Sequence, residues 1–526
     1  MVKARGIAVA PHAAAAGSAA AVLREGGDAI EAMVAAAATI AVVYPHMNGI
    51  GGDSFWLVHE PGQPPRAIDA CGPAGRGVDV AYYGERGVSA IPVRGPLAAN
   101  TCAGTVGGWK LALELSRAAW GGRLPPGRLL ADAIGYAESG IRVTRSQEAS
   151  TAAKLAELSG QPGFAGRFLP NGKVPREGDT FVQKPMGATL RRLAEAGLDD
   201  FYRGDLATTI ALELEAAGAP LAREDLAAYA AEWRHPLALK HSRGMLYNMT
   251  PPTQGVVSLM ILGLLDRMPL PAPESADYVH GIVEATKQAF GVRDRHVTDP
   301  RYMSVDPQSL LEDRALAALA AAVDPGRAKP WGARTAAGDT VWMGTIDAQG
   351  RAVSFIQSIY HEFGSGIVLP ATGINWQNRG CSFSLDPSAR NALVPGRKPF
   401  HTLNPALAQL SDGRTMVYGT MGGDGQPQTQ AAVFTRHVVH GMPLRDAIAA
   451  PRWLLGRTWG SMSETLKLES RFDSALVAEL ARRGHEVEPV GDYDEVVGHA
   501  GALSRTAAGE LEGGFDPRSD GAVVPA

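Results

Sequence analysis

The chain has 526 residues, of which 45% are apolar and 20% are charged, and its formal net charge at neutral pH is −4. A chain of this kind can bury a large core, and its length by itself suggests two or three domains. Because no dense Lys/Arg stripe accompanies this nearly balanced charge, nucleic-acid binding is excluded, and a small-molecule or peptide substrate fits better.

The N-terminus and the cysteines indicate where the protein works. No clean cleavage signal follows the first basic residues, so the N-terminus reads as mature protein. The most apolar run, residues 33–45, is shorter than the ~20 residues of a membrane-spanning helix, and it predicts a buried helix and no membrane partner. The three cysteines, Cys71, Cys102 and Cys381, are too scattered for a disulfide framework or a zinc site. They indicate a reducing, cytoplasmic setting.

The first half of the chain predicts mostly helices. A helix over residues 13–25 stops at two glycines, and the next begins at Asp28, which has the capping-box spacing with Glu31. The glycine-rich stretch NGIGG then leads into a strand over residues 54–60. Alanine-rich helices dominate from 109 to 231, and two further helices are expected at 256–266 and 276–290.

The pattern changes after a stretch rich in Pro, Gly and basic residues at 324–337, which predicts an exposed, mobile linker. Strands follow at 340–347 and 352–360, joined by a hairpin turn at DAQG, and again at 415–421. Thr340 opens the first of these strands. By local composition it is either an ordinary β-branched strand residue or the residue before which the chain is cut.

Most catalytic motifs are missing from the sequence. It has no G-x-S-x-G elbow, no phosphate-binding P-loop, no H-E-x-x-H and no C-x-x-C. What remains is a glycine-rich turn over residues 418–428 that contains Gly422 and Gly423. Two adjacent glycines after a strand either make a purely structural turn or aim two backbone N–H groups at one oxyanion.

Segments along nearly the whole chain resemble the gamma-glutamyltranspeptidase family of N-terminal nucleophile hydrolases. They are AVLREGGDAIEAMVAAAATIAVVYPHMNGIGGDSFWLV, EDLAAYAAEWRHPL, MTPPTQGVVSLMIL, FGSGIVLPATGINWQN and GTMGGDGQPQTQ. The resemblance implies an α+β fold, a four-layer αββα sandwich. It also implies a precursor that cleaves itself between Asp339 and Thr340. Residues 1–339 would form a large subunit and 340–526 a small one, both in one intertwined domain, and a dimer of such heterodimers is compatible with it. It implies no metal and no organic cofactor.

The same resemblance assigns catalytic roles. Thr340, once freed, would carry an α-amine with a pKa of about 8, which can take the proton of its own hydroxyl. Gly422 and Gly423 would hold the oxyanion, and each donor of this type typically contributes ~3 kcal/mol. Ser358 matches the hydroxyl residue that the family keeps near the nucleophile, and we expect it to hydrogen-bond Thr340.

The residues by which the family recognises glutamate are largely replaced. The segment IDACGPAGR lacks the arginine that would hold an α-carboxylate. Tyr360 replaces an Asn, Ser382 replaces an acidic residue, and His401-Thr402 replaces a pair of serines. A charged substrate group that enters such a pocket without its partner loses several kcal/mol, so gamma-glutamyl transfer is disfavoured.

The replacements suggest another substrate. Arg379 is a suitable donor for a small carboxylate, although it can equally be a surface or turn arginine. His401 and Thr402 are candidate polar contacts, although a structural role fits His401 equally well. Tyr360 and Phe400 would close a tight pocket. The pattern is most similar to the family branch of oxamate amidohydrolase and cephalosporin acylases. We therefore predict a self-cleaving amidohydrolase that converts a small carboxylate-bearing amide, best oxamate, to oxalate and ammonia.

Three alternatives stay open at this point. One is a gamma-glutamyl hydrolase or transferase that uses a glutathione-type donor, and another is a cephalosporin-type acylase. The third is an unprocessed binding scaffold without catalytic activity. A drifting scaffold has no reason to keep Thr340, Ser358 and the Gly422-Gly423 pair together, which argues against the third alternative.

Overall fold

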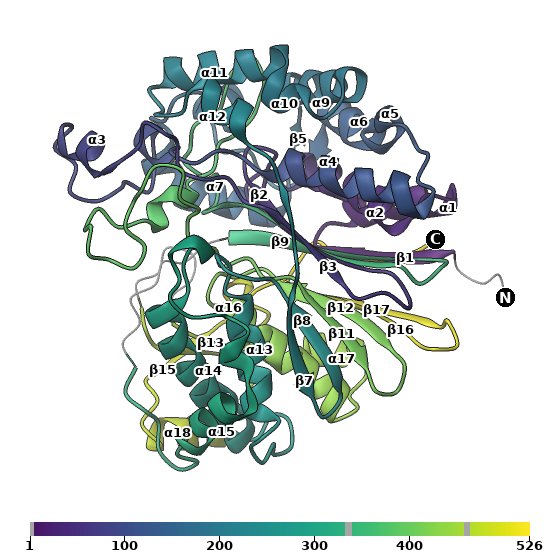
Figure 1. The fold of residues 1–526 in the computed structure, drawn as a ribbon, viewed down its shortest axis with the longest axis vertical. Helices are drawn as coiled ribbons and strands as arrows, with labels where there is room; N and C mark the ends of the chain where they lie inside the picture. The colour runs from purple at the N-terminus through teal and green to yellow at the C-terminus, as the bar shows by residue number, and fades with distance from the viewer. Residues whose placement is uncertain (1–4, 332–338, 457–462) are drawn as a thin grey trace.

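The computed structural model describes residues 5–331, 339–456 and 463–526. Two antiparallel β-sheets face each other, and helices cover the outer side of each (Figure 1). The first sheet has the order β18 (Ala522–Pro525), β1 (Gly6–Ala10), β9 (Asp339–Asp347), β10 (Ala352–Tyr360), β2 (Asp53–His59), β3 (Arg66–Ala70) and β6 (Glu232–Arg234). This arrangement confirms the predicted αββα sandwich.

The second sheet has six strands, again all antiparallel. Their order is β17 (Leu511–Phe515), β16 (Ala500–Arg505), β12 (Thr415–Thr420), β11 (Ala406–Leu410), β8 (Gly244–Asn248) and β7 (Leu237–His241). The first sheet therefore interleaves strands from before and after residue 339. In the second sheet the two groups of strands meet between β11 and β8. Two small sheets lie outside the sandwich: β13 (Trp453–Leu455), β14 (Leu466–Glu469) and β15 (Val487–Val490), and the pair β4 (Ile141–Arg142) and β5 (Thr180–Phe181).

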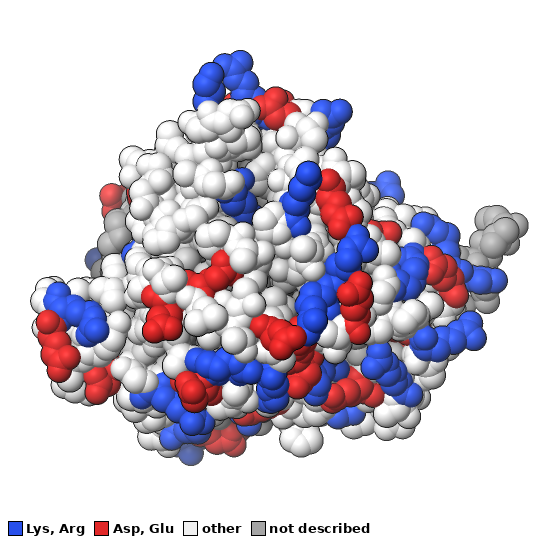
Figure 2. All heavy atoms as spheres, turned by 90° about the horizontal axis from the view of Figure 1, so that it is seen from above, with Lys and Arg blue, Asp and Glu red and all other residues white. Residues whose placement is uncertain are grey.

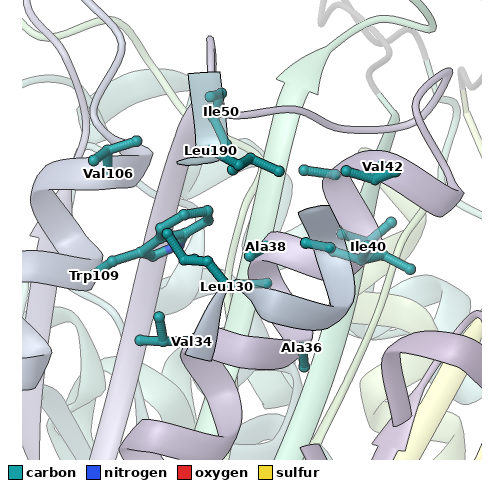
Figure 3. Packing of buried hydrophobic residues seen from close by; sticks show 14 of the residues in the cluster. Val34, Ala36, Ala38, Ile40, Val42, Ile50, Val106, Trp109, Leu130 and Leu190 are labelled. Atoms are coloured by element: carbon teal, nitrogen blue, oxygen red, sulfur yellow. The ribbon is translucent and has the colours of Figure 1, made fainter. Parts of the chain in front are cut away.

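The helical layer on the first sheet is built around α2. All fifteen residues of α2 (Ala29–Val43) are buried, and its N-terminus has the predicted capping box between Asp28 and Glu31. Its apolar side chains pack against those of neighbouring helices, among them Trp109 and Leu190 (Figure 3). The layer comprises α1 (Ala13–Arg24), α4 (Thr105–Leu115), α5 (Pro126–Leu129), α6 (Ala131–Ser139), α7 (Arg145–Leu158), α8 (Phe164–Phe168), α9 (Lys184–Ala196), α10 (Asp200–Arg203), α11 (Asp205–Ala217) and α12 (Arg223–Ala228).

The second helical layer covers the six-stranded sheet. It consists of α13 (Gly255–Leu265), α14 (Ala276–His296), α15 (Asp313–Ala321), α16 (Gly425–Phe434), α17 (Leu444–Ala449) and α18 (Ser474–Arg482), and α3 (Val80–Gly84) lies apart from both layers. The helix expected at 276–290 continues to His296. None of the helices in the described ranges is long and apolar enough to cross a bilayer. On the face seen from above, charges of both signs alternate (Figure 2).

Trp342 fixes β9 within the apolar core between the two sheets. Its indole donates a hydrogen bond to Ser354 Oγ at 3.0 Å. Three glycines from three strands leave the space that the ring occupies, because a Cβ on Gly344, Gly419 or Gly501 would lie within 2.9 Å of an indole atom. The strand that begins with Asp339 and Thr340 is therefore anchored two residues further along.

We expect Gly419→Ala to destabilise the protein by about 1–3 kcal/mol, because the new methyl would lie 2.2 Å from Trp342 Cδ1 in a closed core. The matched control is Gly281→Ala on α14, where a Cβ meets no atom within 4 Å and helix propensity favours alanine. Urea unfolding followed by circular dichroism measures both variants. Equal urea midpoints for the two variants would show that Trp342 does not need the space beside Gly419.

Candidate active site

The core between the sheets changes from apolar to polar at one end, and Thr340 lies at this change. In a strand, residues two apart face the same side. Three polar residues lie two positions along their strands from an apolar residue of this core: Thr340 from Trp342, Ser358 from Ile356, and Asp53 from Phe55. All three are at most 1% exposed. The strand order thus brings a hydroxyl nucleophile candidate, a second hydroxyl and a carboxylate to one buried face.

The strand next to Thr340 is irregular at this point. The register between β10 and β9 shifts between Gln357 and Tyr360, which inserts one residue beside Thr340. Ser358 Oγ accepts a hydrogen bond from the backbone N–H of Tyr360 at 2.8 Å, and Tyr360 has a φ of +82°, in the left-handed region. Ser358 is thus adjacent to the predicted nucleophile, and its bond to Thr340 stays a prediction.

The predicted oxyanion loop approaches from the opposite sheet. It connects β12 to α16, and Gly422 and Gly423 have φ values of +114° and +53°, which favour glycine. Within the described part of the chain, neither of their N–H groups donates to a protein acceptor. Their carbonyls accept from the N–H groups of Gly425 and Gln426 in the first turn of α16. Two backbone donors at a helix N-terminus make a suitable anion site.

Gln254 holds this loop in place, and our sequence analysis did not identify it. Its side-chain Nε2 donates to the carbonyls of Gly423 at 2.8 Å and Thr402 at 2.9 Å. Arg293 donates to Gln254 Oε1 at 2.9 Å and to Asp424 Oδ1 at 2.8 Å. Only the fold brings these segments together, so no local pattern could have predicted the contact.

Arg379 is buried, which excludes the alternative of a surface arginine. It opens the short 3₁₀ helix Arg379–Ser382 and is 1% exposed. Its guanidinium lies 3.7 Å from the centre of the Tyr360 ring, but none of its three nitrogens has a hydrogen-bond partner among the described residues. A buried guanidinium that stacks on an aromatic ring and keeps its donors unused is suited to bind a planar carboxylate.

His401 and Asp53 meet beside this arginine. His401 Nε2 lies 3.1 Å from Asp53 Oδ2, although their orientation forms no hydrogen bond, and both residues are 0% exposed. Asp53 Oδ1 accepts from the N–H groups of Gly72 and Gly104 at 3.0 Å and from Gln377 Nε2 at 3.2 Å. Our sequence analysis missed Asp53. An acidic residue between glycines and an apolar strand was the available signal.

Burial controls the ionisation of this group of residues. Removal from water raises the pKa of Asp53 to about 7, and Arg379 partly opposes this shift. Burial also lowers the pKa of His401 well below its usual value and lowers that of Arg379. The imidazole is therefore neutral at physiological pH. Thr402 Oγ1, beside His401, is buried and forms no hydrogen bond in the described residues.

Two side-chain clusters have ligand types that suit a metal ion. Asp53, Cys71 and His401 place one ligand atom each within 4.8 Å of the others, but the charges of Arg379 and Lys398 act on the same cluster. Two neighbouring cations favour an anion over a metal there. In the second cluster, His280, Glu284 and His485, the ligand atoms are engaged with protein groups, as described next.

The second cluster anchors the segment that leads to the predicted cleavage site. His280 Nδ1 lies 2.8 Å from His485 Nε2, and its other nitrogen lies 2.8 Å from the carbonyl of Asp324. Glu284 accepts from Lys287 and from the N–H of Lys329. The first part of the expected linker is exposed as predicted, except at residue 328, and both of its ends are hydrogen-bonded to α14. Its mobility stays a prediction. Residues 332–337 lie outside the described residues.

The chain is similar to known proteins over nearly its whole length. The family model described as gamma-glutamyltranspeptidase matches residues 13–526. The oxamate amidohydrolase proenzyme of Klebsiella pneumoniae is 59% identical over 99% of each chain, and the glutathione hydrolase-like YwrD proenzyme of Bacillus subtilis is 40% identical over 98% of this chain and 97% of the relative. The crystal structure of cephalosporin acylase from Bacillus halodurans superimposes with a TM-score of 0.90 at 32% identity, covering 99% of this chain and 96% of that one.

These relatives are proenzymes and acylases, and the fold is the sandwich of the N-terminal nucleophile hydrolases. The chain is accordingly an enzyme of the amidohydrolase type. It belongs to the gamma-glutamyltranspeptidase family.

Proposed function

We propose that this chain cleaves itself before Thr340 and then hydrolyses a small amide that carries a carboxylate, with oxamate as the substrate. The observation that carries the proposal is Arg379, buried beside the catalytic strands with all three nitrogens unused among the described residues. A relative at 59% identity is named an oxamate amidohydrolase proenzyme. Oxamate has one carboxylate directly attached to its amide carbonyl, so one cationic contact suffices to orient it.

Cleavage between Asp339 and Thr340 would produce two subunits that remain together. β9, which would carry the new N-terminus, pairs with β1 on one side and with β10 on the other. The second sheet likewise joins β11 from the small segment to β8 from the large one. The products of the cut would therefore share both sheets and the apolar clusters, in which residues from both segments pack together. Whether two such heterodimers pair further stays a prediction.

The reaction would have two halves with the same nucleophile. The α-amine of Thr340 takes the hydroxyl proton while Oγ attacks the amide carbon, and the oxyanion forms near the N–H groups of Gly422 and Gly423. The C–N bond then breaks, and the proton held by the amine goes to the leaving ammonia. Water next attacks the acyl-threonine, again through the amine as base, and releases oxalate.

The recognition site would consist of Arg379, Tyr360, His401 and Thr402. Arg379 would grip the substrate carboxylate with two parallel N–H bonds, since its planar fork matches that geometry. Tyr360 fixes the arginine by stacking, and His401 and Thr402 offer further polar atoms that are buried without a formed hydrogen bond among the described residues.

The degree of closure favours a small substrate. In the uncleaved chain Thr340, Tyr360 and Arg379 are each 1% exposed, and Phe400 is 8% exposed. A glutathione-type donor or a β-lactam side chain would need an open groove at these residues. The two alternative substrate classes, taken from relatives with such names, therefore have less support than oxamate.

We expect wild-type protein to separate into two fragments divided between residues 339 and 340, and Thr340→Ala to remain a single chain, because alanine has no nucleophile for the cut. Intact mass spectrometry measures both. The control is Thr345→Ala on the same strand, which loses a hydrogen bond to the carbonyl of Ala29 but should still be cleaved. An intact wild-type chain would favour the unprocessed scaffold.

We expect Arg379→Lys to lower kcat/KM for oxamate about 10- to 100-fold, because a lysine keeps the charge and loses the bidentate contact, which corresponds to about 1.5–3 kcal/mol. Ammonia and oxalate release measures the rate. Oxamide, which lacks the carboxylate, serves as the control substrate, and its rate should change far less. An equal loss for both substrates would mean that Arg379 supports the fold and not the carboxylate.

A further inference from the structure

Among the described residues, Asp53 is the carboxylate whose charge acts on the unused guanidinium of Arg379. The charge of Arg379 favours the ionised form of Asp53, and the charge of Asp53 favours the protonated form of Arg379. They form no direct ion pair within the described residues. One oxygen of Asp53 is saturated by three N–H donors, whereas Oδ2 has only the 3.1 Å approach of His401 Nε2. This free oxygen can take a proton and direct it at the imidazole.

The pocket can hold only a limited net charge. With Asp53 ionised and His401 neutral, the pair of Asp53 and Arg379 is electrically neutral, which burial favours. A substrate carboxylate at Arg379 would bring a second negative charge into the same buried space. Two carboxylates that share one cation cannot both remain ionised without a large free-energy cost.

We propose that Asp53 is the resident counter-ion of Arg379 and that a carboxylate ligand binds there together with one proton, which the Asp53–His401 pair retains. This inference rests on the proposed role of Arg379 as the carboxylate site. The step involves no bond to the substrate, since the proton comes from solvent and lies between Asp53 Oδ2 and His401 Nε2. By taking up this proton, the pair offsets the negative charge of a small anion that binds at the buried site.

The neighbouring side chains do not titrate in the same pH range as Asp53, whereas the α-amine that cleavage would free at Thr340 does. Burial raises the pKa values of the nearby thiols and phenols far above neutrality, and neighbouring carboxylates raise that of Lys398 against its burial. These groups are Cys71, Cys102, Tyr202, Tyr229 and Lys398. We assign the proton to the Asp53–His401 pair as a unit, and because Asp53→Asn keeps the Thr340 amine, that variant separates the two sources of proton uptake.

The sign of the pH effect follows from linkage. Burial raises the pKa of Asp53 in the free enzyme to about 7, and a bound carboxylate near Arg379 would raise it further. Below pH 7 the proton is already present, so binding takes up none. Above pH 7 the proton must be bound at the same time, so affinity should fall about tenfold per pH unit.

The test is calorimetry of the mature wild-type enzyme with oxalate and with acetate as probes. Titrations at pH 6 and pH 8, each in two buffers of different ionisation enthalpy, give the number of protons taken up on binding. We expect uptake close to zero at pH 6 and approaching one at pH 8. The pH dependence of KM for oxamate provides the second readout.

Asp53→Asn is the informative variant, because its amide oxygen keeps the three hydrogen bonds that Asp53 Oδ1 accepts while the second oxygen is lost. We expect this variant to bind the probes without proton uptake and with an affinity that does not fall above pH 7. The control is Asp69→Asn, a buried carboxylate paired with Lys398, which should keep the wild-type proton uptake. If Asp53→Asn does not fold, the absence of proton uptake by the wild-type enzyme at pH 8 would still overturn the inference.

Each outcome is decisive. Binding at pH 8 without proton uptake overturns this inference and leaves the proposed function intact. Proton uptake without oxamate hydrolysis refutes the proposed substrate and supports the inference. Probes that do not bind at all overturn both, because the carboxylate site itself would then be absent. Proton uptake that persists in Asp53→Asn assigns the proton to another group and overturns the inference.

Discussion

The anchoring of β9 between the two sheets is the constraint on which the rest of the site depends. Trp342 fills a space formed by glycines of β9, β12 and β16, and it therefore ties the strand of the nucleophile to the sheet that carries the glycine loop. The proposed nucleophile and the proposed oxyanion loop come from opposite sheets. Their relative position is thus set by the packing of one indole ring, two residues from Thr340.

The same arrangement explains how a self-cleaving chain can keep its active site after the cut. In the first sheet, β9 and β10 from the small segment lie between β1 and β2 from the large segment. The upstream segment is held separately, through His280 and Glu284 on α14. The break between Asp339 and Thr340 would remove Asp339, which pairs with Tyr360, and leave the other pairs of β9 with β1 and β10 in place.

Local sequence patterns were sufficient to predict many of the helices and strands, but not the contacts that form the candidate site. The two strand-like segments over 340–347 and 352–360, with the turn between them, predicted β9 and β10. The capping box at Asp28 is also present as expected. The family resemblance supplied the sandwich. Asp53 and Gln254 were missed because their roles arise from contacts with His401 and Gly423, which lie more than 160 residues away in the chain. The bonds that hold the first part of the linker to α14 were missed for the same reason.

Electrostatics gives the clearest reason why this pocket differs from one that binds glutamate. An amino acid group presents a carboxylate and an ammonium together, so its binding site needs a cation and an anion that are both available. Here Asp53 Oδ1 is committed to backbone donors and Gln377, and its other oxygen faces a neutral imidazole. Among the described residues of this site, the guanidinium of Arg379 keeps its donors available. On the proposed function, one available cation beside a protonatable carboxylate would favour a ligand with one negative charge and no ammonium, as in oxamate.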